Sequence, residues 1–180
     1  MYQRFNEKGM NMTTTQRVRS AIDKFHLLKH PFYQDWMTGD LTMEQLQNYA
    51  VQYYPHVQDF PRFVSAIHSQ CEDPAGRRFL LENLMDEEGV RYDHNHPDLW
   101  RHFGIGLGVS EQAMVESEIQ PQAKKLVSDF WSLCRGSYAE GLAALYAYEY
   151  KVPEIAQLKI DGLKKNYAVT DAKTLAFFAV

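Results

Sequence analysis

Glu87 is a carboxylate on the apolar side of a predicted helix, and it is the first residue of this sequence that suggests chemistry. Residues at i, i+3, i+4 and i+7 share one helix face, and this face carries Leu80, Asn83, Leu84 and Glu87. A buried charge is costly unless it is paired or bound to a cation. His94 and His96 follow shortly after and offer imidazole donors. The stretch indicates a metal site, with a solvated acidic helix end as the alternative.

Glu149 repeats this pattern on a second predicted helix. Ser137 is a candidate N-cap for that helix, and Glu149 falls on the apolar stripe of Leu142, Leu145 and Tyr146. Two helices that each bury a glutamate, with a histidine beside one of them, are typical of carboxylate-bridged dimetal sites in helical bundles. Such a site needs further ligands from another helix.

The elements that would position these residues are all predicted helices. Caps, prolines and apolar residues at helical spacing predict helices over residues 13–28, 31–38, 42–70, 74–87, 96–107, a short one from 110, then 121–134, 138–149, 153–167 and from 170 to the end. Pro55 and Pro61 should kink or divide the long third helix. No stretch has a convincing strand period, so the predicted fold class is all-α.

Composition limits the classes of protein that the chain can belong to. The 180 residues are 45% hydrophobic and 13% aromatic, which predicts one well-packed domain over residues 13–180 after a flexible segment at 1–12. A net charge of −4 without a basic cluster gives no surface for nucleic acid. No apolar run or cationic helix suggests a membrane.

Cysteine usage and the N-terminal sequence bear on the compartment. Cys71 and Cys134 are isolated in the sequence and form no metal or redox motif, as expected of reduced thiols. The N-terminus lacks the pattern of a signal peptide. We therefore expect a cytoplasmic protein.

Ordered blocks of residues carry a family resemblance. The blocks are His30-Pro31-Phe32-Tyr33-x-x-Trp36, Leu41-Thr42-x-Glu44-Gln45-Leu46, Tyr53-Tyr54, Phe60-Pro61, Ala66-Ile67-His68-Ser69-x-Cys71, Asn83-Leu84-Met85-Asp86-Glu87-Glu88, Asn95-His96-x-Asp98-Leu99-Trp100 and Ala144-Leu145-Tyr146-x-Tyr148-Glu149. From about Phe25 to Val180 the sequence resembles the CADD-like family of para-aminobenzoate synthases (chlamydial protein associating with death domains). This family is related to PqqC and TenA within the heme-oxygenase-like dimetal oxidases.

The resemblance implies a seven- to eight-helix heme-oxygenase-like bundle that uses two iron ions, or a mixed manganese and iron pair, to activate dioxygen with a reductant. It implies synthesis of para-aminobenzoate for folate by oxidative cleavage of one of the protein's own tyrosines, with an internal lysine as amino donor. By position, the resemblance implies metal ligands at Glu87, His96 and Glu149. The sacrificed tyrosine falls on Tyr33, the lysine on Lys159 and an accessory tyrosine on Tyr49. The family also allows a homodimer.

Two departures from the family pattern stand out. His94 has the spacing from Glu87 that the family would predict, whereas His96 keeps the surrounding Asn-His-x-Asp-Leu-Trp motif and is preferred as the ligand. The family's second ligand set, a His, Asp and His group on the final helix, should begin directly after Val180. We expect that helix to be truncated or missing here, and oxygen chemistry to fail without it.

Several residues keep two interpretations. Lys159 is either a lysine stem that reaches solvent or a desolvated amine that acts as a nucleophile. Tyr33 either packs a helix junction or points inward to react. His56 and His68 could line the same cavity, although a lone histidine on an aromatic helix is usually hydrogen-bonded core. They receive no catalytic role.

Alternatives also remain for the function as a whole. These are a PqqC-like oxidase of a separate small molecule and a metal-free helical interaction protein. TenA-like thiamin hydrolysis fits less well, because neither Cys71 nor Cys134 can be placed as its nucleophile.

Overall fold

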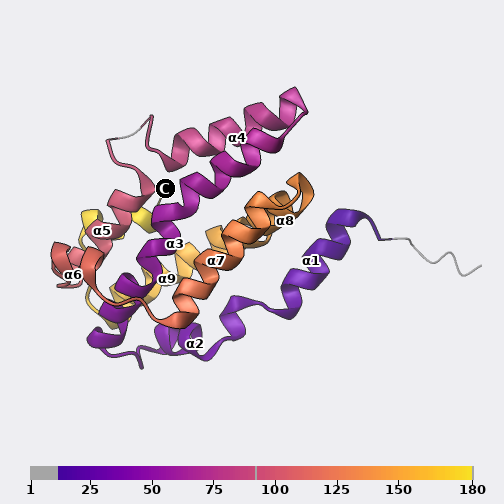
Figure 1. Cartoon of the computed structure of the whole chain (residues 1–180). Coiled ribbons are helices and arrows are strands. Elements are labelled where there is room, and N and C mark those ends of the chain that lie inside the picture. Colours follow the sequence, from indigo (N-terminus) through magenta and orange to yellow (C-terminus); the bar gives the residue numbers. More distant parts are fainter. Residues whose placement is uncertain (1–11, 92, 180) are drawn as a thin grey trace, which may run out of the picture.

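The computed structural model describes residues 12–91 and 93–179, and within them it contains helices and no strand (Figure 1). Its elements are α1 (Thr14–Lys24), η1 (Leu27–Lys29), α2 (Pro31–Thr38), α3 (Met43–Gln70), α4 (Pro74–Glu87), α5 (His96–Gly106), α6 (Glu111–Glu116), α7 (Pro121–Arg135), α8 (Tyr138–Glu149), α9 (Val152–Asn166), α10 (Ala172–Leu175) and η2 (Ala176–Phe178). The all-α prediction is confirmed.

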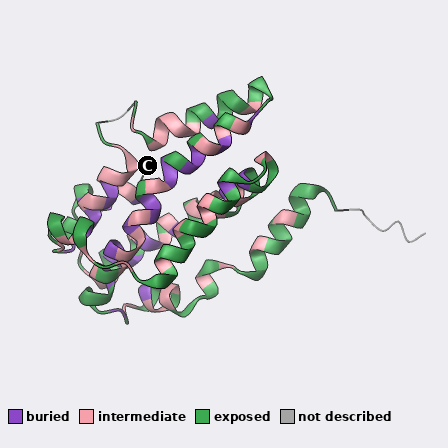
Figure 2. Cartoon of the chain, viewed as in Figure 1, coloured by how far each residue is buried: buried purple, intermediate pink, exposed green. Residues whose placement is uncertain are grey.

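Helix α3 is the element on which the others pack. Figure 1 shows it crossing the molecule, with α4 folding back along its second half, and α5, α7 and α8 also pack against it. Buried residues gather along α3, whereas α1 and α6 are largely exposed (Figure 2). The core has two parts, one around Trp36 and Trp100 and the other around Phe63 and Leu80. Both parts include residues of α3, so this helix joins them.

Local sequence fixes most helix starts. Thr13, Thr42 and Ser137 each accept a hydrogen bond from the backbone of the third helical residue, whose side chain bonds back to the cap. These capping boxes satisfy backbone N–H groups that have no partner within the helix. Asp73 caps α4 in the same way through its carboxylate, with Pro74 in the first turn.

Pro55 and Pro61 were predicted to kink or divide the third helix, and the division is wrong, because α3 runs unbroken through both. A proline removes one N–H and crowds the preceding turn. Here the packing of α4, α5 and α7 against α3 holds the helix together across both positions. Tertiary contacts outweigh the local cost.

Three further boundaries differ from the prediction. Helix α1 ends at Lys24 and Phe25 beyond it is 84% exposed, so the apolar face predicted up to Leu28 is interrupted there. Leu142 is exposed rather than on the buried stripe of α8, which instead presents Gly141 and Leu145 to the core. The helix predicted from residue 170 is the short α10 followed by the 3-10 turn η2.

The predicted flexible segment 1–12 lies outside the described residues except for Met12, so this division of the chain stays a prediction. Among the described helices, none has the length and apolar character needed to cross a membrane.

A close approach between α2 and α9 gives a test of the packing. A Cβ on Gly162 would lie 2.7 Å from Cδ1 and 2.9 Å from Nε1 of Trp36, a rigid and fully buried side chain. Gly162→Ala should destabilise the fold by about 1–2 kcal/mol, because the cost of overpacking exceeds the gain in helix propensity. Urea unfolding measures the change. The exposed neighbour Lys164 is the control: Lys164→Ala should stay within about 0.5 kcal/mol of the parent. An equally stable Gly162→Ala variant would contradict this packing.

Candidate functional site

Lys159, on α9, has its amine inside the bundle. The residue is 6% exposed, and its Nζ donates a hydrogen bond of 2.6 Å to the hydroxyl of Tyr49 on α3. Nζ also lies 4.9 Å from the ring centre of Tyr49 and 5.5 Å from that of Tyr33 on α2. The rings of Trp36 and Phe178 complete the surroundings at 5.7 Å and 5.4 Å. The structure therefore favours the desolvated amine over a stem that reaches solvent.

Burial shifts the pKa values of these groups. Desolvation lowers the pKa of Lys159 to about 7, because the charged ammonium loses water and gains few partners. Burial raises the pKa of Tyr49 well above its ordinary value, with Tyr33 and Tyr53 adding to the effect. Burial also raises the pKa of Tyr33, and a hydrogen bond with Tyr49 opposes that rise. Near neutral pH the site therefore holds protonated phenols and an amine that is neutral in a substantial fraction of the molecules.

Contacts between α2 and α9 set the positions of Tyr33 and Lys159. The indole Nε1 of Trp36 donates to the backbone carbonyl of Lys159 at 3.2 Å. The side-chain amide of Asn166 donates to the carbonyl of Met37 at 2.8 Å, and the hydroxyl of Tyr167 donates to that of Asp35 at 3.3 Å. The two helices are joined at several successive turns, which fixes the tyrosine and lysine in register.

Glu87 and His96, at the end of α4 and the start of α5, form a second centre. Glu87 Oε2 lies 3.5 Å from His96 Nδ1. Burial, with a smaller contribution from the nearby carboxyl of Glu149, raises the pKa of Glu87 to about 8. Burial also raises the pKa of Glu149, on α8, and a side-chain hydrogen bond from Asn83 opposes that rise. The two glutamates predicted on separate helices are thus enclosed close to each other.

Between the two candidate histidines, the structure places His96 beside Glu87. His94 instead packs edge-on against His102, with 4.9 Å between the ring centres. Burial lowers the pKa of His96, so its imidazole is neutral and able to act as a ligand.

These residues suit a metal ion by type and burial. His96 Nδ1 and Asn83 Oδ1 are buried without a hydrogen-bond partner among the described residues, and two neighbouring carboxyl groups share the same enclosed region. Carboxylate and imidazole donors suit ferrous and manganous ions. However, within residues 12–91 and 93–179 no three such side chains converge into a ready coordination sphere. The cluster is a partial donor set.

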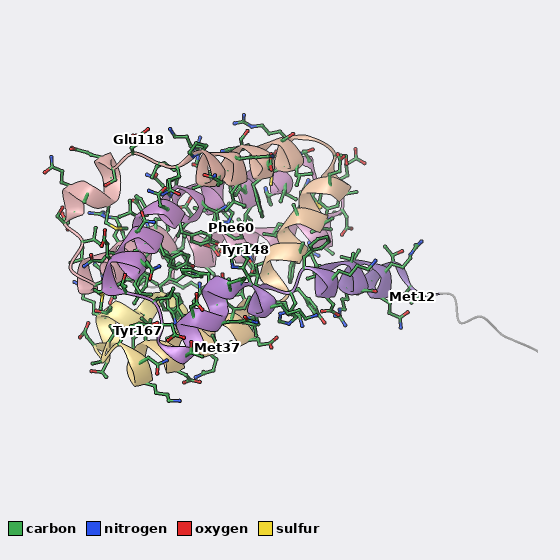
Figure 3. All side chains as sticks on the ribbon, turned by 90° about the horizontal axis from the view of Figure 1, so that it is seen from below. Met12, Met37, Phe60, Glu118, Tyr148 and Tyr167 are labelled. Carbon is green, nitrogen blue, oxygen red and sulfur yellow. The ribbon has the colours of Figure 1, made fainter. Side chains whose placement is uncertain are left out.

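A tyrosine pair that the sequence analysis did not single out connects the two centres. Tyr53, on α3, stacks on Tyr49 with 5.5 Å between ring centres and donates a hydrogen bond of 3.0 Å to the hydroxyl of Tyr148. Tyr148 precedes Glu149 and lies in the middle of the bundle beside Phe60 (Figure 3). Both tyrosines fall in motifs that carry the family resemblance, which was the signal that could have marked them.

His56 belongs to the core as expected, but the expected hydrogen bond is not found. The residue is 1% exposed, but neither ring nitrogen has a hydrogen-bond partner in the described part of the chain.

The fold and the site together define a class of protein. It is an all-helical bundle with a buried lysine, enclosed tyrosines and two neighbouring buried carboxyl groups. Residues 15–178 match the TENA/THI-4/PQQC family, and the chain belongs to that family. The heme-oxygenase-like bundle expected from the resemblance is confirmed.

Named relatives fall into two groups. A 4-aminobenzoate synthase of Chlamydia muridarum is 43% identical over 172 residues, covering 95% of this chain and 72% of the relative. One of Nitrosomonas europaea is 40% identical over 178 residues, with 93% and 72% covered. A pyrroloquinoline-quinone synthase of Acinetobacter baylyi is 25% identical, with 93% and 69% covered.

A solved structure supports the fold alone. A TenA homologue from Pseudomonas syringae superposes with a TM-score of 0.75 at 19% identity, covering 90% of this chain and 69% of that one.

The raised pKa of Glu87 predicts how the metal-free protein responds to pH. The folded pKa of about 8 exceeds the ordinary 4.5, so the folded state binds the proton more tightly than the unfolded chain. Its contribution to stability is complete below about pH 4.5 and is lost as pH rises to about 8. Between about pH 4.5 and pH 8, the free energy of unfolding of the parent should fall by an amount on the order of a few kcal/mol because of this carboxyl. Glu87→Gln should remove that fall, because the amide does not titrate.

The measurement is thermal or urea unfolding of protein treated with a chelator, across the pH series. Glu82→Gln, at an exposed position of the same helix, should keep the parent's slope. If Glu87→Gln and the parent have the same pH profile, the carboxyl is not held in its neutral form.

Proposed function

We propose that this protein is an oxygen-dependent two-metal enzyme that makes 4-aminobenzoate, the compound also called para-aminobenzoate, from its own Tyr33, with Lys159 as the source of nitrogen. The observation that carries the proposal is the buried Lys159 amine, hydrogen-bonded to Tyr49 at 2.6 Å and 5.5 Å from the ring centre of Tyr33. Similarity to 4-aminobenzoate synthases at 40% and 43% identity supports this reaction.

Glu87, His96 and Glu149 would hold a metal ion, with further ligands completing the pair. Iron, or iron with manganese, suits these donors. When bound, the metal pair supplies the activation of dioxygen, and an external reductant provides electrons. A cation would also relieve the cost of keeping two carboxyl groups buried close together.

The residues around Lys159 would prepare the organic part of the site. A pKa of about 7 leaves much of the amine unprotonated at neutral pH, so its lone pair is available. The Tyr49 hydroxyl holds the amine near the Tyr33 ring, and the surrounding aromatic side chains limit access of water. The backbone bond from Trp36 keeps this part of α9 against α2.

Single substitutions test whether the protein is its own substrate. Tyr33→Phe should abolish 4-aminobenzoate formation, because the product ring would come from this side chain. Lys159→Arg should do the same by removing the amino donor. Chromatography with mass spectrometry after anaerobic loading with ferrous and manganous ions, followed by oxygen, measures the product per chain.

Tyr150→Phe, at a half-buried position, and Lys164→Arg, at an exposed one, are the matched controls and should retain the parent's yield. Protein grown with 15N-labelled lysine should give labelled product. If Tyr33→Phe forms as much product as the parent, the self-sacrifice mechanism is wrong. That result would favour an oxidase acting on a separate molecule, as the similarity to pyrroloquinoline-quinone synthases would allow.

Metal binding is tested separately from catalysis. Glu149→Gln should weaken binding of manganous ion roughly 10- to 100-fold, because it replaces a charged ligand with a neutral amide. Isothermal titration under anaerobic conditions measures the affinity. Exposed Glu116→Gln should bind like the parent. A parent protein that takes up neither iron nor manganese would favour the metal-free interaction protein instead.

A further inference from the structure

His56 is a buried polar side chain that the proposed reaction does not use. It lies on α3 between the two parts of the core, and both ring nitrogens are inaccessible to water and lack a hydrogen-bond partner among the described residues. A buried imidazole without a partner is less favourable than one that is hydrogen-bonded. A hydrocarbon side chain would avoid that cost, so the histidine needs an explanation.

Five aromatic rings surround the imidazole at centre distances between 4.8 Å and 5.8 Å, and they belong to Tyr53, Phe60, Phe63, Phe130 and Tyr148. Only Tyr53 and Tyr148 among these carry a hydroxyl. The nearest acid that influences His56 is Asp59, whose carboxylate already accepts from Trp131 at 2.8 Å and pairs with Arg62. The tyrosine hydroxyls are therefore the natural partners.

The Tyr53 and Tyr148 hydroxyls share one hydrogen bond of 3.0 Å. Each phenol has one proton to give, so the pair keeps one proton for which no acceptor is found among the described residues. The ring of Tyr148 is the nearer of the two to His56, at 5.0 Å against 5.2 Å. Burial lowers the pKa of His56 to about 4, so the neutral imidazole keeps one nitrogen free to accept. An unused donor and an unused acceptor thus belong to rings whose centres are 5.0 Å apart.

We infer that His56 is a positioning residue for Tyr148: one ring nitrogen accepts the Tyr148 hydroxyl proton through one buried water and completes a relay from Tyr53 through Tyr148 to His56. The relay crosses from α3 to the last turn of α8, one residue before Glu149. It would therefore hold the end of α8, and with it the Glu149 carboxyl, against α3.

A double-mutant cycle tests the hydrogen bond without metal or activity. His56→Phe and Tyr148→Phe each keep an aromatic ring and remove only the polar partner. His56→Phe should raise the unfolding equilibrium constant about fivefold. Tyr148→Phe should raise it more, because it also leaves the Tyr53 hydroxyl without its partner, and the double variant should add little beyond Tyr148→Phe alone. Urea unfolding of the metal-free protein gives the constants. Additive effects, or a His56→Phe variant more stable than the parent, would overturn the relay.

A control on the same helix separates this coupling from general effects. Tyr146 bonds Arg19 at 2.7 Å, and His56 is not among its partners. Tyr146→Phe and His56→Phe should therefore combine additively. In protein with 15N-labelled histidine, Tyr148→Phe should move the resonance of one His56 ring nitrogen, and Tyr146→Phe should not. An unmoved resonance overturns the relay even if a variant of the cycle fails to fold.

The consequence for metal binding rests on the proposed function. His56→Phe should weaken manganous ion binding severalfold, and His56→Gln, which keeps an acceptor, should restore part of it. If the parent binds no metal, the proposed function fails while the coupling of His56 to Tyr148 can still be measured. If the parent binds metal and the cycle is additive, the relay fails alone.

Discussion

The hydrogen bond from the Lys159 amine to the Tyr49 hydroxyl is the interaction on which the arrangement of this bundle depends. An amine that is 6% exposed with one short bond at 2.6 Å is tolerated only if it sheds its charge or gains compensation from the rings around it. Both conditions demand that α2, α3 and α9 stay in one register. The bonds from Trp36, Asn166 and Tyr167 maintain that register.

The carboxylate centre poses the same physical problem with the opposite charge. Glu87 and Glu149 lie in an enclosed region, and burial raises the pKa of each carboxyl, with the Glu149 carboxyl adding to the rise at Glu87. In the metal-free protein, protonation is the available relief. A bound cation would remove the need for it, which links metal loading to the stability of the folded chain.

Tyr53 and Tyr148 join the two centres across the boundary between the two parts of the core. Tyr53 packs against the part around Trp36 and Trp100, and Tyr148 against the part around Phe63. Their hydroxyl bond is a polar contact between two hydrophobic clusters. His56 lies beside both tyrosines, so three polar side chains are gathered where water has little access.

Helix class and helix starts were determined by the sequence alone, because capping boxes at Thr13, Thr42 and Ser137 and the apolar period act over a few residues. The sequence also predicted the apolar stripe of the helix that carries Glu87. Only the tertiary structure decided that α3 continues through Pro55 and Pro61, that His96 rather than His94 lies beside Glu87, and that Lys159 is enclosed. Each of these depends on which distant helix covers a residue, and burial, unlike capping, is not a property of neighbouring residues in the chain.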